Sequence, residues 1–327
     1  MTTRFFRTFV YTVLIFISVS HHQVVASESN TTNAVHKRVN EIVSLLQKEN
    51  NPEAVFSVSL NGIPDNEVHA KPLDPGKWIP QGEKAELNRY VGALAFVRIS
   101  APFFKVSRSA ISYSDESKFT PGILSTKIVD HKRLSNENEV LILERERDLP
   151  LTLRPFFPTG SRYRLSNTLI SKTDSWLSAR IALISSLHHS RNLLKSLEGF
   201  EFYQKLSDGK TLVFMGVFAL PNTGALASKK DFSVKIPNPL SKVTLGVLDK
   251  VVSTLDVRDK LYSEVSKAVV DGAYQNAVGL TQITTDPRWK SKWTYQLTGE
   301  ESKQILTENK AILEKAKKNK WIEYELH

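Results

Sequence analysis

The sequence predicts an α+β fold in which a curved antiparallel sheet wraps around a long helix near the C-terminus. Three observations support this class. A strand pattern over 94–100 leads through Ala101-Pro102 into a helical pattern, several β-rich runs extend to Leu220, and a long amphipathic helix is predicted from Leu240 to Val278. With the elements in this order, we expect the sheet to curl around the helix and to leave a cavity between them.

The chain before this sheet is predicted to contain a helix, a strand and an irregular connection. Apolar residues spaced three and four apart indicate a surface helix from Asn33 to Lys48. The run from Val55 to Leu60 predicts a strand, and Asn61-Gly62 is a turn signal after it. The stretch from Pro64 to Gln81 is rich in Pro, Gly and charge, so we expect no regular structure there.

The central part is predicted to consist of a strand, a short helix and then six further strands. The first strand covers 92–100 and the helix 103–113. The six later strands are expected at 124–131, 139–147, 161–171, 176–185, 199–205 and 211–220. The last two form the clearest hairpin, because Asp208-Gly209 supplies the positive φ that such turns need.

Two helices complete the predicted fold. A loop from Pro221 to Pro239 precedes the long helix, and a second, more highly charged helix is predicted from Glu300 to Lys320. The patterns divide the chain into four parts: a leader at 1–26, an N-terminal segment at 27–91, a central domain at 92–278 and a charged helical appendage at 279–327.

Composition indicates a globular protein and excludes a disordered or multi-spanning one. The chain has 327 residues, of which 41% are hydrophobic and 24% charged, with a net charge of +10. Its mean hydropathy is -0.25. A basic chain is attracted to anionic membranes, anionic ligands or nucleic acid, although diffuse charge kept for solubility explains the same balance. Because an exported chain rarely meets nucleic acid, we expect no nucleic-acid partner.

The first residues have the pattern of an export signal. Arg4 and Arg7 precede an apolar run from Phe9 to Ser20, and Val24-Val25-Ala26 places small residues where a signal peptidase needs them. We therefore expect cleavage near Ala26, with an uncleaved anchor as the alternative. The chain has no cysteine, which favours a periplasmic over a secreted location.

The stretch from Val97 to Val106 and the stretch from Thr120 to Val129 resemble the START-like superfamily, which includes polyketide cyclases and the birch-allergen-like proteins. The resemblance covers about half of the chain, over 92–278. It departs from the family pattern in both flanking segments and in a helix-like insert at 186–196. It implies a helix-grip fold with an apolar cavity for lipids, sterols, polyketides or similar molecules. A minority of such proteins are cyclases, hydrolases or assembly factors.

Strand alternation gives independent candidates for the lining of a cavity. Phe200 and Phe202 share one face of their strand, and Leu212, Phe214 and Phe218 share one face of the next. The opposite face of that second strand is apolar as well, so we expect both of its sides to be covered. The predicted helix contributes four further candidates: Leu248, Val251, Leu255 and Tyr262. The alternative is that all of these residues form ordinary close-packed core.

Basic side chains are candidates for holding the polar head group of a ligand. Arg145 and Arg147 share one face of a strand, Arg162 and Arg164 repeat the spacing on the next, and Arg180 follows on a third. If these strands are neighbours, their guanidiniums can hold a carboxylate or phosphate. Solvent-facing ion pairing is the alternative.

The remaining motifs, and those that are absent, argue mainly against a metal site and against known catalytic motifs. His188-His189 has no third ligand at metal-binding spacing, and no phosphate loop, Gly-x-Ser-x-Gly or His-Glu-x-x-His motif is present. We therefore expect no metal and no cofactor. Trp289 and Trp293 alternate with basic residues, which suits peripheral contact with a membrane, although packing onto the domain explains them as well.

Together these observations predict an exported protein that binds a hydrophobic or amphipathic, lipid-like molecule non-covalently. Two alternatives remain open. One is a cyclase- or hydrolase-type enzyme on the same fold. The absence of catalytic motifs makes an enzyme less favoured but does not exclude it, because acid and base residues on separate strands leave no local motif. The other is an interaction module that has no cavity and uses the outer face of the sheet.

Overall fold

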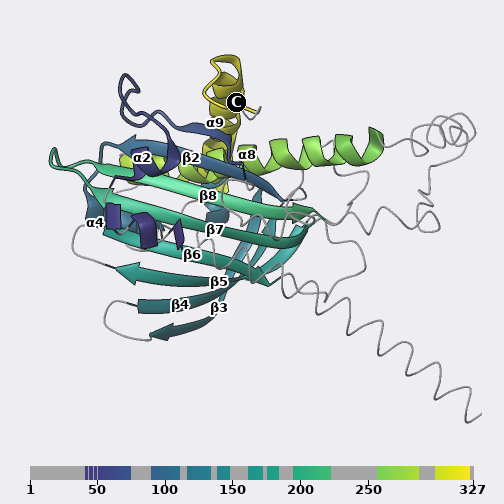
Figure 1. Cartoon of the computed structure of the whole chain (residues 1–327), viewed down its shortest axis with the longest axis horizontal. Coiled ribbons are helices and arrows are strands. Elements are labelled where there is room, and N and C mark those ends of the chain that lie inside the picture. The colour runs from purple at the N-terminus through teal and green to yellow at the C-terminus, as the bar shows by residue number, and fades with distance from the viewer. Residues whose placement is uncertain are drawn as a thin grey trace, which may run out of the picture.

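The sheet of the protein has eight strands, all antiparallel, in the order β1-β2-β8-β7-β6-β5-β4-β3 (Figure 1). The computed structural model describes residues 41–42, 44–46, 48–49, 51–74, 90–110, 116–133, 138–147, 161–171, 175–183, 194–221, 256–286 and 299–324. In β5, β6 and a few other positions it describes only the backbone. The strands are β1 His69–Pro72, β2 Val91–Ile99, β3 Ile123–Arg133, β4 Asn138–Arg147, β5 Ser161–Ser171, β6 Ser175–Leu183, β7 Leu194–Lys205 and β8 Thr211–Pro221.

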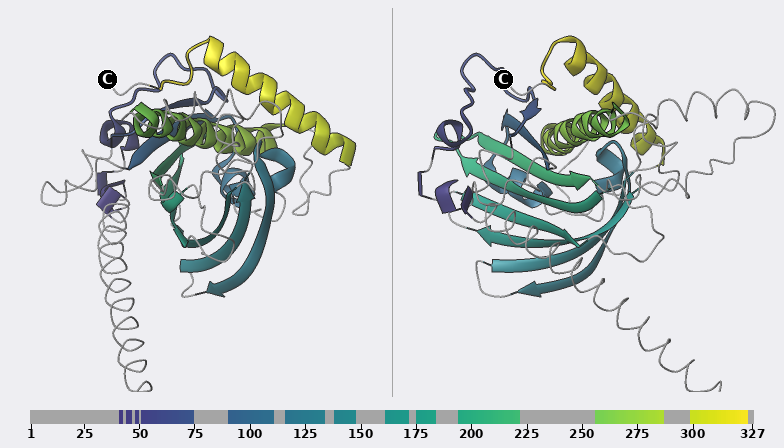
Figure 2. Two further views of the ribbon diagram at one scale, coloured as in Figure 1. Left: turned by 90° about the vertical axis from the view of Figure 1, so that its right-hand side faces the viewer. Right: turned by 45° about the vertical axis from the view of Figure 1, so that its right-hand side comes forward.

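Five helices accompany the sheet in the described part of the chain, together with helical residues between positions 41 and 49. They are α2 Pro52–Phe56, α4 Phe103–Ala110, α5 Glu116–Phe119, α8 Asp256–Thr285 and α9 Gly299–Lys318. Figure 2 shows α8 lying across the open side of the curled sheet, with α9 on the far side of α8. A curved antiparallel sheet closed by a long C-terminal helix is the helix-grip arrangement, so the predicted fold class is confirmed.

The two faces of the sheet carry two separate apolar clusters. On the inner face, which is the face toward α8, alternate residues of β2 and β8 (Ala93, Ala95, Val97, Val213 and Met215) form a cluster with Val270, Ala273, Tyr274 and Ala277 of the helix. On the outer face, residues of β2, β7 and β8 (Leu94, Phe96, Phe200, Phe202, Leu212, Phe214 and Phe218) form a cluster with Ile42, Leu46, Phe56 and Leu60 of the N-terminal segment. Strand β8 is therefore covered on both sides, as its two apolar faces predict.

Helix α2 is where the structure corrects a predicted strand. Residues 55–60 are β-rich, but Pro52 occupies the first turn of a helix and the Asn51 side chain caps it by accepting a hydrogen bond from the Ala54 backbone N–H at 3.2 Å. These start signals outweigh the β propensity that follows them. The short helix then places the Phe56 ring against Phe200 and Phe214, at centroid distances of 5.3 and 5.5 Å.

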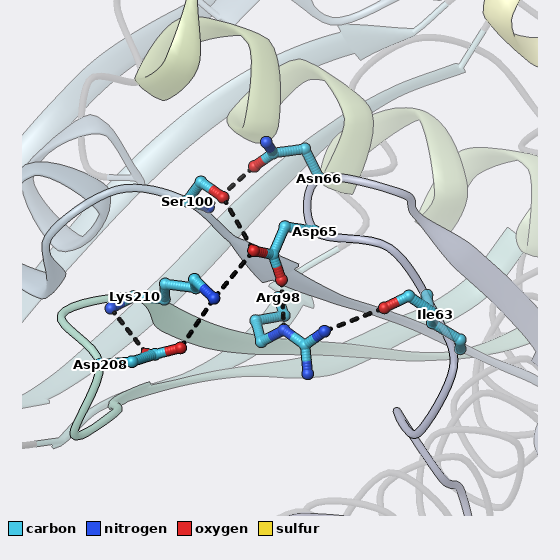
Figure 3. A network of polar contacts seen from close by, with 7 residues as sticks. All are labelled: Ile63, Asp65, Asn66, Arg98, Ser100, Asp208 and Lys210. Carbon is cyan, nitrogen blue, oxygen red and sulfur yellow. Dashed lines mark hydrogen bonds and ion pairs between the residues drawn. The ribbon is translucent and has the colours of Figure 1, made fainter.

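A polar network fastens the segment after α2 to the ends of β2 and β8 (Figure 3). The Asp65 carboxylate pairs with the Arg98 guanidinium and also accepts from Lys210 Nζ at 2.9 Å and from Ser100 Oγ at 3.2 Å. Lys210 Nζ in turn reaches Asp208 Oδ2 at 2.8 Å. These partners, Arg98 foremost, lower the pKa of Asp65 from 3.8 to about 2.

Both flanking segments pack on the central sheet and on α8. The stretch predicted as irregular contains β1, a strand too short to have a clear pattern of its own, which pairs with β2. Ala70 of β1 exchanges backbone hydrogen bonds with the chain after α9: its N–H donates to Trp321 O, and its carbonyl accepts from Glu323 N–H. Ala316 and Ile322 are buried in the inner-face cluster.

Apart from α5, a short helix that was not predicted, the remaining elements agree with the predicted ones within a few residues. The hairpins β3–β4 and β7–β8 form as expected, and β7 begins at Leu194, inside the region predicted as an insert. Helix α8 continues to Thr285, seven residues past the predicted end. The predicted leader, Trp289, Trp293 and the first part of the long helix, including Leu248, Val251 and Leu255, lie outside the described residues. No helix among the described residues is long and apolar enough to cross a membrane.

Candidate functional site

The inner face of the sheet is the candidate site because α8 covers only one side of it closely. The helix packs mainly on β1, β2 and β8, and the sheet continues through β7, β6, β5 and β4 to β3 (Figure 2). The register fixes which residues share this face, because directly paired residues of antiparallel strands point the same way. On β4 these are Leu141, Leu143, Arg145 and Arg147, which alternate with Ile142, Glu144 and Glu146.

A buried carboxylate lies within this apolar face. Glu201 of β7 pairs with Met215 of β8, and its side chain is 4% exposed. The hydroxyl of Tyr203, two residues along the same face, donates to Glu201 Oε2 at 2.8 Å. The pair therefore places a polar group among apolar side chains.

A second polar group on the inner face joins β4 to α5. Arg145 Nη2 lies 2.5 Å from Glu116 Oε2, and both side chains are buried. Thr126 of β3 donates to the same carboxylate oxygen at 3.0 Å. Taking two charges out of water is costly, so a buried pair of this kind depends on its mutual attraction and on added hydrogen bonds such as that from Thr126.

Arg147 connects the same strand directly to α8. Its Nη2 donates to Asn276 Oδ1 at 2.8 Å. The guanidinium also lies close to Gly272 of α8, where a Cβ atom would be 2.3 Å from Arg147 Nη1. Arg145 and Arg147 thus occupy the end of the inner face where β4, α5 and α8 meet.

The predicted cluster of arginines does not form on one face. In the register of β4 and β5, Arg162 is opposite Glu146 and Arg164 is opposite Glu144, so positions 162 and 164 belong to the outer face. Opposite charges in direct cross-strand positions fit the ion-pairing alternative. Arg180 is opposite Gly199 of β7 and belongs to the inner face. The head-group hypothesis is therefore wrong in placing Arg162 and Arg164 together with Arg180.

The predicted cavity candidates on β7 and β8 also lie on the outer face. Phe200, Phe202, Leu212, Phe214 and Phe218 pack against the N-terminal segment and away from α8. Alternation showed that the second of these strands has two apolar faces, but it could not show which of them meets the helix. Tyr262 is on α8, where it packs against the cluster formed by Val91, Ala219 and Val265.

Sequence reasoning missed the pair of Glu201 and Tyr203 and the partner of Arg145. One signal for the first was present: a glutamate in the middle of a hairpin whose neighbouring strand is apolar on both faces. Glu116 gave no signal, because it precedes β3 in the chain and meets Arg145 only through the tertiary fold. Among the described residues, no group of three His, Cys, Asp or Glu side chains is placed to hold a metal ion.

Solved structures of START domains and polyketide aromatase/cyclases are among those similar to this chain. The Zhui aromatase/cyclase from Streptomyces sp. R1128 is 11% identical, with a TM-score of 0.38 over 60% of this chain and 97% of that one. Human StAR-related lipid transfer protein 5 is 8% identical, with a TM-score of 0.37 over 70% and 97% of the two chains. The STAR-related lipid transfer protein from Xanthomonas axonopodis is 11% identical, with a TM-score of 0.31 over 40% and 70%. No protein-family model and no curated protein matches the chain.

Proposed function

We propose that the protein binds a hydrophobic or amphipathic, lipid-like molecule non-covalently, at the inner face of the sheet beside α8. The observation that carries the proposal is the mixed lining of that face. Leu141 and Leu143 are buried there in the same apolar cluster as α8, and Glu201 and Arg145 are buried among such residues. Small-molecule sites are mostly apolar, with a few polar groups that fix orientation.

The polar groups suggest how an amphipathic ligand is oriented. The Glu201 carboxylate suits a ligand hydroxyl because carboxylate oxygens accept hydrogen bonds, and the Tyr203 hydroxyl, which donates to Oε2, helps to fix its orientation. The guanidiniums of Arg145 and Arg147 suit an anionic group at the end near α5, although both already bond protein partners there. In this proposal the apolar part of the ligand lies along β4 between these two ends.

Native mass spectrometry of the purified protein tests binding directly. We expect one small molecule to be retained per chain, and a fluorescent fatty acid to bind the delipidated protein with the same stoichiometry. A protein that retains nothing and binds no such probe would contradict the proposal.

The orienting role of Glu201 has a matched control on its own strand. Glu198 is also a buried glutamate of β7, but it is opposite Phe218 and so belongs to the outer face. We expect Glu201→Gln to lower the affinity for a hydroxyl-bearing fatty acid relative to its unsubstituted analogue, and Glu198→Gln to leave this ratio unchanged. Equal effects of the two variants would argue against an orienting role.

The buried carboxylate also favours one alternative, an acid–base enzyme of the cyclase or hydrolase kind. A carboxylate beside a tyrosine hydroxyl in an apolar site can transfer protons to a bound molecule. If this alternative holds, molecules extracted from the wild-type protein and from Glu201→Gln will differ in mass or structure. Identical extracts support binding alone. The cavity-less interaction module is less favoured, because the N-terminal segment already covers the outer face of β7 and β8.

Export remains part of the proposal, supported by the basic and apolar pattern of residues 1–26. The intact mass of the protein after expression in a bacterium tests it. We expect a chain that begins at Ser27, and a chain that retains the leader would favour the anchor. Peripheral membrane contact through Trp289 and Trp293 stays a prediction.

A further inference from the structure

The edge strand β3 carries an unusual share of exposed apolar surface. Among the described residues, five large apolar side chains are exposed, and three of these lie on β3. They are Leu124 at 54%, Ile128 at 42% and Val129 at 44% exposed. Strand β3 ends the sheet opposite β1, so one of its sides has no neighbouring strand in the described sheet. Clustered exposed apolar residues commonly mark an interaction surface.

Two bulges argue against another protein strand as the partner of this edge. The register of β3 on β4 shifts between Ile123 and Ser125 and again between Ile128 and Asp130. The extra residues are therefore Leu124 and Val129, two of the exposed apolar ones. Bulges interrupt the ladder of an edge strand and are one of the means by which proteins block strand addition.

Charge argues against a second copy of this chain. Strand β3 carries Lys127, Lys132 and Arg133 as exposed basic residues, and Asp130 as its one acidic residue, which pairs with Lys132 at 3.4 Å. Two copies brought together at this edge would each present this excess of positive charge, and charges of one sign repel each other.

We propose that β3 docks on the surface of a membrane that contains anionic lipids. Leu124 and Val129 would enter the head-group region, and Lys127 and Arg133 would lie at the level of the phosphates. A lipid surface needs no hydrogen-bond register, so the bulges that block a protein strand do not hinder it. Each basic residue near an anionic surface strengthens the attraction, and the net charge of +10 adds to it. This proposal is independent of ligand binding at the inner face.

A fluorophore at a single position tests this docking in the full chain, because the protein has no cysteine of its own. We would label Val129→Cys with the polarity-sensitive probe NBD and add phosphatidylcholine vesicles with or without phosphatidylglycerol. The control is Phe104→Cys on α4, another exposed apolar position, at 61%. We expect a blue shift and a rise in intensity at position 129, with phosphatidylglycerol vesicles only. No change at 129, or the same change at 104, would overturn the proposal.

Charge variants of the labelled chain provide a second measurement. We expect Lys127→Gln with Arg133→Gln to weaken binding to phosphatidylglycerol vesicles by roughly 30-fold. Lys318→Gln with Lys320→Gln removes two exposed basic residues near the end of α9 and should leave binding nearly unchanged. Because the variants differ only at the substituted positions, any contribution of residues 1–26 is the same in all of them. A probe response at 129 that depends on protein concentration without vesicles would identify a second copy as the partner and refute membrane docking.

Discussion

The outer and inner faces of the sheet are built from alternate residues of the same strands, yet their chemistry differs. On the outer face, aromatic rings of β2, β7 and β8 stack on one another and on Phe56, and the Asp65 network fastens the covering segment at its exposed rim. On the inner face, small residues of β2 meet α8, while β4 and β7 carry buried charged groups. Burying charge costs stability, and the inner face buries Glu116, Arg145 and Glu201 where the outer face buries Glu198. In the proposed function, the outer face mainly stabilises the fold and the inner face contacts the ligand.

Removal of the Phe56 ring should have the largest effect on stability. The ring is buried and stacks on Phe200 and Phe214. Phe56→Ala should lower the free energy of unfolding by about 4 kcal/mol, measured by urea denaturation. Phe104→Ala, at an exposed phenylalanine, is the control and should have little effect. If Phe56→Ala lowers the free energy of unfolding no more than Phe104→Ala does, the packing of Phe56 on the outer face does not stabilise the protein.

Breaking the inner-face ion pair should cost nearly as much. Arg145→Met leaves the buried Glu116 carboxylate without the guanidinium at 2.5 Å, which should lower the free energy of unfolding by about 3 kcal/mol. The double variant Arg145→Met with Glu116→Gln should lose less than Arg145→Met alone, because no unpaired charge is left buried. A double variant that is less stable than the single one would contradict this account of the pair.

A smaller effect is expected where the outer face leaves no room for a methyl group. A Cβ atom on Gly216 would lie 2.0 Å from the Phe200 ring, which packs flat over that glycine. Gly216→Ala should lower the free energy of unfolding by about 2 kcal/mol through overpacking. Adding Phe200→Leu to this variant should recover part of the loss, and strictly additive losses would show that the ring is not the obstacle.

The smallest effect belongs to the polar rim of the outer face. The pKa of Asp65 is lowered from 3.8 to about 2 on folding, so its pairing stabilises the protein fully above pH 4 and is lost as the pH falls toward 2. We expect Asp65→Asn to remove about 1 kcal/mol at pH 6, after allowance for solvent screening, and to have little further effect at pH 2. Denaturation of both proteins at the two pH values measures this. A cost for the variant that is the same at both values would exclude the ion pair as its source.

Regular elements could be predicted from the sequence because their signals are local. The β7–β8 hairpin follows from Asp208-Gly209 between two β-rich runs, and α8 from its long apolar periodicity. Helix α2 was missed because its start signals, Asn51 and Pro52, come just before a run of residues with high β propensity, which suggested a strand. Strand β1 was missed because four residues carry no readable period and depend on β2 for their conformation.

The candidate site was harder to predict because it depends on which side of each strand meets α8. Alternation grouped Phe200 with Phe202 and Phe214 with Phe218, and these groups are real, but they lie under α2. The choice between the faces is made by segments far away in the sequence: α8 on one side and the residues around Phe56 on the other. Register likewise decides that Arg164 is opposite Glu144 and not beside Arg180.

The most direct test of the division between the two faces is the affinity for a fluorescent fatty acid of two matched variants. Leu143 on the inner face and Phe214 on the outer face are both fully buried apolar residues, so both alanine variants should lose stability. We predict that Leu143→Ala weakens binding by about tenfold, through lost apolar contact, while folded Phe214→Ala binds as the wild type does. Weaker binding by Phe214→Ala, with no effect of Leu143→Ala, would contradict the assignment of the ligand to the inner face.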